Sequence, residues 1–345
     1  EFADPLLRVA ELDHVADVEV GPDPGAFELV DVPGEFDRAE EELVPDFLDG
    51  EDDAVFFGEG DEFADFLFNL GWTLLSLGQP KEAAACLESS LRASNGQEPH
   101  LPKLYNLLAQ TQSTVGDALR AISICKKGRE AFPDDCELLF TEAMAFYKLG
   151  DFRRAATDLE RLTQMNSRAT MALCLREDLT TVIARHHLAI VYRDQGRFND
   201  AETEWRRVLT EQPEMRPALV GLAELVLVEG RWLELEDLCK AIETLPDGQR
   251  DAGVLRARSW LARNDYVRAQ RILEPIVHNY PTEVWPLEIL SRVFLQSAQW
   301  PQAERALRGI LLLDPNHNAA KSNLTRLLLE NQERRMESNR PFSES

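Results

Sequence analysis

The stretch "ARHHLAIVYRDQGRFNDAETEWRRVLTEQP", residues 184–213, decides the fold, because its small residues, its glycine and its proline recur along the chain at a fixed spacing. Within it, Gly196 follows Ala189 by seven positions, Ala201 comes five positions later, and Pro213 comes twelve positions after that. The same pattern, with stand-ins at some positions, is seen in Ala109, Gly116, Ala121 and Pro133; in Ala143, Gly150, Ala155 and Ser167; in Ala223, Gly230, Leu235 and Asp247; in Ala257, Asn264, Ala269 and Pro281; and in Ser291, Ala298, Ala303 and Pro315. An earlier copy contains Gly71, Gly78 and Ala83.

The spacing has a simple physical interpretation. Each unit is expected to be two short amphipathic helices, with the glycine allowing the turn between them because it tolerates left-handed backbone angles. Small residues are expected where the two helices cross closely, and proline where the second helix ends. No unit can bury its apolar face alone, so neighbouring units must stack.

The units start near residues 64, 102, 136, 182, 216, 250 and 284, and the last four starts are 34 residues apart. This period and pattern match the tetratricopeptide repeat. The sequence therefore predicts an all-α, right-handed superhelix of about seven helix pairs over residues 63–335. A half-repeat from residue 318 is expected to form a C-terminal capping helix, followed by a disordered tail at 336–345.

Charge is distributed very unevenly. The whole chain carries a formal charge of −24, and residues 1–62 contain 22 Asp and Glu against two Arg, a net charge of −20. Such a surface repels phosphates, so we expect no nucleic-acid partner. The segment 1–62 is also rich in Gly and Pro, and it is predicted to be an irregular acidic arm.

The five cysteines are scattered and contain no CxxC pair, which is typical of a reducing compartment. No basic segment followed by an apolar run opens the sequence, and no apolar stretch reaches the length of about 20 residues that a membrane helix needs. These observations predict a cytoplasmic protein with no membrane insertion, although the sequence lacks an initiating Met and its natural start could be missing.

A search for catalytic and cofactor motifs finds none. The sequence contains no GxxxxGK[ST] phosphate loop, no GxGxxG, no HExxH and no GxSxG. His186 and His187 are adjacent and point about 100° apart on a helix, which does not suit zinc; we expect His187 to pack in the repeat and His186 to lie on the groove wall. Asp134 and Asp135 follow Pro133 and are expected to cap a helix. No metal, cofactor or catalytic residue is predicted.

The concave face is the candidate binding site. Positions 2, 5, 9 and 12 of each first helix tend to line that face in this fold. They give Lys103, Asn106, Gln110, Phe140, Met144, Tyr147, His186, Arg193, Glu224, Leu227, Arg258, Trp285, Glu288 and Arg292. Arginine with aromatic and amide side chains suits an extended peptide. The alternative is that these residues only keep the inner face soluble.

Two other segments could contribute to binding. The interval between the third and fourth starts has twelve extra residues, near 165–178, which form either a functional loop or a tolerated surface insertion. The acidic arm could compete for the groove by meeting Arg193, Arg258 and Arg292, or it could remain solvated.

Several phrases, among them "CKKGREAFPDDCELLF" and "ARHHLAIVYRDQGRFNDAETEWRRVL", resemble the C-terminal repeat region of bacterial family 2 glycosyltransferases of the planctomycete type. The resemblance covers about residues 66–235. It implies that the repeats could recruit the acceptor for such an enzyme. The sugar-nucleotide-binding domain of that family, with its Asp-rich metal motif, is absent from the sequence, so the resemblance assigns no catalytic residue here.

The sequence therefore favours a protein- or peptide-binding scaffold or adaptor. The acceptor-recruiting portion of a glycosyltransferase is the alternative, and the sequence names neither the partner nor the oligomeric state.

Overall fold

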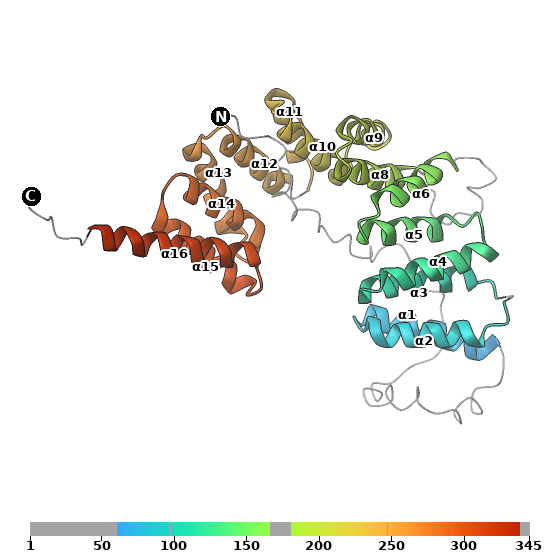
Figure 1. The fold of residues 1–345 in the computed structure, drawn as a ribbon. Helices are drawn as coiled ribbons and strands as arrows, with labels where there is room; N and C mark the ends of the chain where they lie inside the picture. The colour runs from blue at the N-terminus through green and yellow to red at the C-terminus, as the bar shows by residue number, and fades with distance from the viewer. Residues whose placement is uncertain (1–60, 97, 166–180, 247, 339–345) are drawn as a thin grey trace, which may run out of the picture. The chain divides into compact units, whose positions relative to one another are not determined.

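The computed structural model describes residues 61–96, 98–165, 181–246 and 248–338, and these residues form fifteen α-helices and no strand (Figure 1). The predicted all-α class with paired helices is confirmed. The acidic arm, apart from residues 61 and 62, lies outside the described residues. So do the insertion near 165–178, apart from Met165, and most of the tail.

The described helices belong to two compact units, one ending at Ser259 and the other beginning at Trp260. The first unit contains α1 (Asp61–Ser76), α2 (Pro80–Ala93), α3 (Leu101–Val115), α4 (Ala118–Ala131), α5 (Cys136–Lys148), α6 (Phe152–Gln164), α8 (Val182–Asp194), α9 (Phe198–Glu211), α10 (Arg216–Val228), α11 (Trp232–Glu243) and most of α12 (Gly248–Ala262). The second contains the end of α12, then α13 (Tyr266–Asn279), α14 (Val284–Gln296), α15 (Trp300–Leu313) and α16 (Asn318–Ser338).

Helices pack as antiparallel neighbours in the order of the chain. In the first unit α1 packs on α2, α3 on α4, α5 on α6, α8 on α9 and α10 on α11. The second helix of a pair also packs on the first helix of the next, as α4 does on α5 and α6 on α8. In the second unit α14 packs on α15 and α15 on α16. Each pair therefore completes the core of its neighbour, as stacking repeats must.

The turns within the pairs confirm the role that the spacing gave to glycine. Left-handed backbone angles occur at five of these glycines, with φ between 72° and 100°: Gly78, Gly116, Gly150, Gly196 and Gly230. In the remaining turns the stand-ins Asn264 and Ala298 adopt the same conformation, at φ 59° and 57°. The geometry of the turn is thus kept even where glycine is not.

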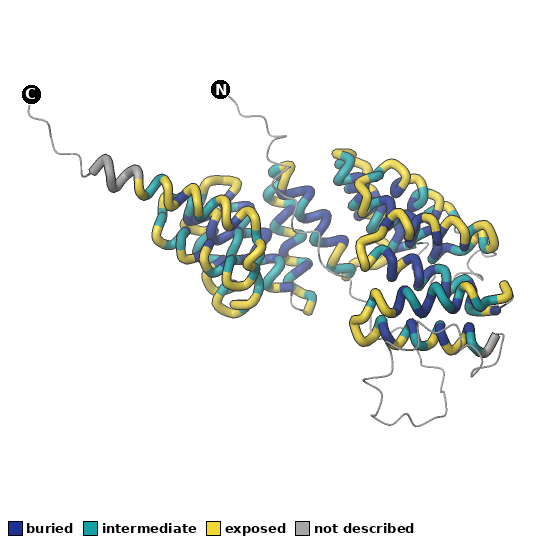
Figure 2. The backbone as a smooth tube through the Cα atoms, turned by 60° about the horizontal axis from the view of Figure 1, so that its bottom comes forward, coloured by how far each residue is buried: buried dark blue, intermediate teal, exposed yellow. Residues whose placement is uncertain are grey.

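The small residues of the pattern are buried at the helix crossings. Fully buried alanines are Ala109, Ala143, Ala189, Ala223 and Ala257 on first helices, and Ala121, Ala155, Ala201, Ala269 and Ala303 on second helices. Figure 2 shows the same alternation, with buried stretches facing neighbouring helices and exposed stretches facing outward. Close approach of the helix axes depends on these residues.

Aspartates cap several of the second helices and α5. The Asp135 carboxylate accepts a hydrogen bond from the Leu138 backbone N–H at 2.8 Å, so Asp135 caps α5 as predicted. Asp117, Asp151 and Asp265 cap α4, α6 and α13 in the same way. Each cap satisfies a backbone N–H that the helix itself leaves unpaired.

The final helix, α16, occupies the position of the first helix of a repeat, and no second helix follows it among the described residues. Ala320 and Leu327 are buried, whereas Thr325 is exposed. In the complete repeats the position equivalent to Thr325 is a buried alanine, Gly71 or Ser291, covered by the second helix of the pair. This pattern agrees with a capping helix.

Three cysteines are free and buried: Cys86, Cys125 and Cys239. Burial raises the pKa of Cys125 and of Cys239 to about 12, so both stay protonated and unreactive at neutral pH.

Candidate binding surface on the first helices

Most of the predicted groove residues lie on α3, α5, α8, α10 and α12, the first helices of successive pairs. Their side chains range from buried, as Asn106 is, through half-buried, as Phe140 and Tyr147 are, to exposed, as Gln110 is. Because equivalent positions on stacked helices lie side by side, side chains from one helix can reach the next. In the first unit, two such sets of contacts involve the predicted groove residues.

The longer set links four first helices through five side chains, which we call the first-helix ladder: Tyr147, Asp194, Arg193, Glu224 and Arg258. The Tyr147 hydroxyl donates to Asp194 Oδ2 at 2.6 Å, and Arg193 Nε donates to Asp194 Oδ1 at 2.8 Å. Arg193 Nη1 lies 3.8 Å from Glu224 Oε2, and Arg258 Nη1 donates to Glu224 Oε1 at 2.7 Å. The ladder thus runs from α5 through α8 and α10 to α12.

The ladder is electrically balanced and partly shielded from water. Its two arginines face two carboxylates, and the side chains of Arg193, Glu224 and Arg258 are 26%, 17% and 14% exposed. Burial opposes the charge on Arg193, but the hydrogen bond and charge of Asp194 outweigh it, so the pKa of Arg193 lies above its usual value. Arg193 and Arg258 therefore already form ion pairs with carboxylates within the repeats. An acidic ligand could bind these arginines only by displacing Asp194 and Glu224.

A second, shorter set joins α3 to α5 around Asn106. Thr141 Oγ1 donates to Asn106 Oδ1 at 2.6 Å, and Asn106 Nδ2 donates to Glu137 Oε2 at 2.9 Å. Gln110 Nε2 donates to the same Asn106 oxygen at 3.3 Å, and Gln110 remains exposed. Lys103 lies half-buried one turn before Asn106 on α3.

The adjacent histidines have packing roles. The His187 ring meets Phe140 edge-to-face with centroids 5.1 Å apart, and Trp205 Nε1 donates to His186 Nδ1 at 3.2 Å. Burial lowers the pKa of His186 to about 3 and that of His187 to about 4, so both are neutral at physiological pH. No group of three metal-ligating side chains occurs among the described residues.

The predicted residues on α14 belong to the second unit and are described separately. The Glu288 carboxylate pairs with the His317 ring at the start of α16. Trp285 is half-buried and Arg292 is exposed.

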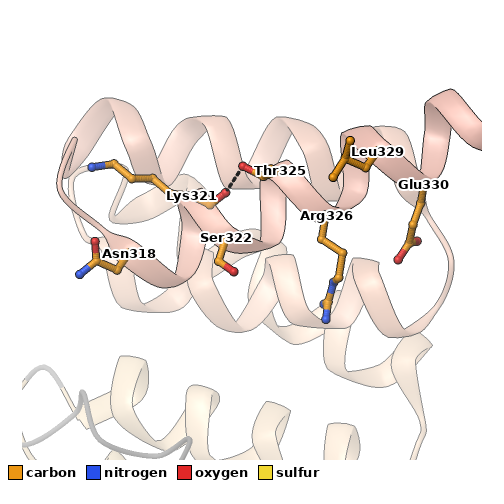
Figure 3. Close-up of a pocket in the computed structure, with 7 residues that line it drawn as sticks. All are labelled: Asn318, Lys321, Ser322, Thr325, Arg326, Leu329 and Glu330. Carbon is orange, nitrogen blue, oxygen red and sulfur yellow. Dashed lines mark hydrogen bonds between the residues drawn. The ribbon is translucent and has the colours of Figure 1, made fainter.

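The second unit also has an open face on α16. Figure 3 shows the depression there, lined by Asn318, Lys321, Ser322, Thr325, Arg326, Leu329 and Glu330, with the Thr325 hydroxyl donating to the Lys321 carbonyl at 2.8 Å. All seven residues come from one helix. The depression is therefore the uncovered face of the capping helix, and it contains none of the predicted groove residues.

Sequence reasoning missed four residues that organise the surface: Asp194, Glu137, Thr141 and Trp205. Asp194 ends α8, outside the positions assigned to the groove, yet it connects Tyr147 to Arg193. The one feature of the sequence that could have indicated this role is that Asp194 directly follows Arg193. Trp205 lies on the second helix α9, so a rule restricted to first helices could not find it.

No helix among the described residues is long and apolar enough to cross a bilayer.

Comparison with known proteins agrees with the fold. Tetratricopeptide repeat models match residues 64–96, 140–176, 187–248 and 251–275. A tetratricopeptide repeat protein from Parabacteroides merdae has a similar structure, with TM-score 0.64 and 16% identity over 78% of this chain and 100% of that one. PilW, a type IV pilus biogenesis factor, is similar with TM-score 0.52 and 17% identity over 68% of this chain and 100% of that one.

No curated protein matches the chain, and the matching family models are repeats alone. The resemblance to family 2 glycosyltransferases therefore gains no support from these comparisons. The repeated spacing, the paired helices with left-handed turns and the matching models agree that residues 64–96, 140–176, 187–248 and 251–275 form tetratricopeptide repeats.

Proposed function

We propose that the first unit binds an extended segment of a partner protein along the face formed by α3, α5, α8, α10 and α12. Tetratricopeptide repeats are in general protein-interaction scaffolds, and the choice of this face is our own proposal. The observation that carries it is the first-helix ladder. Its side chains are fixed by contacts from helix to helix and retain partial exposure, so little conformational entropy remains to be lost when a ligand binds.

The chemistry of the face suggests the kind of segment that it takes. Both ladder arginines are neutralised by Asp194 and Glu224, which argues against a strongly acidic ligand. Carboxylates and amides retain lone pairs that can accept backbone N–H groups, and Phe140 and Tyr147 offer half-buried aromatic surface. We therefore expect a peptide of low net charge with aliphatic or aromatic anchors.

A displayed library of random peptides, selected against the full chain, tests this proposal. Enriched peptides are then measured by titration calorimetry against Gln110→Ala and Phe140→Ala, which alter the face. Thr203→Ala on the outer side of α9 is the matched control, because Thr203 is exposed on a second helix. Loss of an anchor contact at Phe140 is expected to weaken binding by about 1–2 kcal/mol, with the control unchanged.

Two results would overturn the assignment. One is a selection that enriches no peptide for the full chain over a denatured sample. The other is a set of peptides that bind both face variants as tightly as the unaltered chain.

A further inference from the structure

Many cations of the first unit are paired with carboxylates, among them Arg185, Arg216 and Arg256, each with a carboxylate oxygen within 3.0 Å. On α4, Arg120 and Arg129 are also paired, with Glu88 and Glu142. Four other exposed cations of α4 and α6 have no carboxylate within ion-pair distance among the described residues: Lys126, Lys127, Arg153 and Arg161. With Arg154, which is 64% exposed, we call these five residues the α4–α6 basic patch.

The patch is continuous because α4 and α6 both pack on α5. Lys126 Nζ from α4 lies 5.8 Å from the centre of the Phe146 ring, and Arg154 Cζ from α6 lies 5.1 Å from the same ring. Phe146 is buried beneath them. One aromatic ring thus brings cations from both helices together at the surface.

Most of the acidic groups near the patch are half-buried or already engaged; Glu160 of α6, for example, accepts a hydrogen bond from the Tyr192 hydroxyl at 2.7 Å, whereas Asp134 after α4 is exposed. Burial and the nearby Glu142 raise the pKa of Asp158 to about 6, while Lys126 and Arg161 act in the opposite direction. Asp158 is half-buried, and Glu142 is buried and paired with Arg129. Asp151 pairs with Arg154, and Glu130 is exposed on α4. The exposed surface of the patch therefore remains positive.

The chain contains a ligand of opposite charge. Residues 1–62 have a net charge of −20, whereas the remaining residues have a net charge of only −4. An extended residue spans about 3.3 Å, so sixty residues before α1 can reach α4 and α6, which lie only one and two pairs further along. Covalent attachment raises the effective concentration of the segment to about the mM range, so a weak contact is populated.

We infer that the acidic segment 1–60 docks on the α4–α6 basic patch. The first-helix ladder does not offer this segment equivalent cations, because Arg193 and Arg258 are engaged with Asp194 and Glu224. Docking on the patch leaves the proposed peptide-binding face free, and the two proposals stand independently. The contact is electrostatic, so it weakens as the screening length falls from about 10 Å at 0.1 M salt to about 3 Å at 1 M.

Carbodiimide cross-linking of the full chain tests this inference, because the reagent condenses a carboxylate with a lysine amine only where the two groups meet. Peptide mass spectrometry then counts links from Asp or Glu in residues 1–60 to each lysine. Lys81 and Lys240 serve as internal controls, since both are exposed and lie on other helices. We expect the links to concentrate on Lys126 and Lys127 at low salt and to disappear at about 1 M salt.

Two double variants distinguish the effect of the patch charge from the intrinsic reactivity of the lysines. Arg154→Gln with Arg161→Gln keeps both lysines and removes two patch charges, so links to Lys126 and Lys127 should fall. Arg92→Gln with Arg271→Gln removes the same charge from exposed positions on α2 and α13, and these links should not change. Mixing isotope-labelled and unlabelled chains shows whether the links lie within one molecule, as expected.

Any of three results would overturn the inference: links spread evenly over all exposed lysines, links to the patch that persist in the Arg154→Gln and Arg161→Gln variant, or links found mainly between labelled and unlabelled chains.

Discussion

At the scale of single residues, the left-handed turn is the strictest local requirement of the fold. Five turns use glycine, whereas Ala298 adopts φ 57° with a Cβ atom that opposes this conformation. For an ordinary residue the left-handed region costs roughly 1–2 kcal/mol. Asn264 is more tolerant, because asparagine can hydrogen-bond locally there. The turn at Ala298 therefore stores strain that the turn at Gly196 does not.

Exchanging the residue type at these two turns should change stability in opposite directions. Gly196→Ala is expected to lower the free energy of unfolding by about 1 kcal/mol, and no steric clash contributes, because an added Cβ at Gly196 meets nothing within 4 Å. Ala298→Gly should relieve strain and leave stability equal or higher. Urea unfolding of both full-length variants measures the effect. Equal destabilisation by the two exchanges would contradict the argument.

Single residues also differ in whether their structural role could be predicted from the sequence. The turn stand-ins Asn264 and Ala298 could be identified in advance, because spacing alone fixes the position of a turn in a repeat. The partners of Arg193 could not. Its contact with Glu224 depends on how α8 and α10 are placed against each other, and that placement is a property of the packed helices. Its contact with Asp194 depends on the rotamers of two neighbouring side chains, which the sequence does not fix.

At the scale of helices, a close contact between α9 and α10 joins the fourth repeat to the fifth. Gly221 on α10 faces the buried Trp205 ring of α9, and a Cβ at Gly221 would lie 2.6 Å from the ring. A rigid indole in a packed core cannot move aside easily. In α15, by contrast, a Cβ at Gly309 would lie 3.0 Å from the tip of Leu287, which can shift by rotation.

Alanine at these two glycines should therefore give different results. Alanine favours the helix over glycine by about 1 kcal/mol, so Gly309→Ala is expected to be neutral or stabilising. At Gly221 the clash with Trp205 should outweigh that gain, with overpacking typically costing about 1–3 kcal/mol. Urea unfolding of the two variants provides the comparison. A stabilising Gly221→Ala would show that α9 and α10 can separate without penalty.

Helices could be predicted from the sequence wherever the 34-residue pattern is unbroken. Glycine marks the turn, alanine marks the helix crossing and proline marks the end of the second helix, and each has a local physical reason. α16 could also be recognised as a half-repeat. The close fit of Gly221 against Trp205 could not, since neither residue belongs to the pattern and their contact joins two different repeats. The extra residues near 165–178 fall mostly outside the described part of the chain, and their role stays a prediction.

At the scale of the whole array, stability within the first unit should be distributed by nearest-neighbour contacts. Among the described helices of the first unit, the main contacts between helix pairs join adjacent pairs, and the first-helix ladder links α5 to α12 through successive contacts between neighbouring helices. In such an array a local defect is felt most by the repeats beside it.

Ala201→Trp tests this distribution. Ala201 is fully buried where α9 crosses α8, so an indole there should overpack the crossing and cost about 1–3 kcal/mol or more. Amide hydrogen exchange of the full chain should show lost protection in α8–α11, with α1–α4 nearly unchanged, because the intervening helices absorb the defect. Thr203→Trp is the matched control, since Thr203 is exposed two positions further along the same helix, and it should leave protection unchanged throughout. Uniform loosening of α1–α11 by Ala201→Trp would instead show that the first unit opens as one cooperative block.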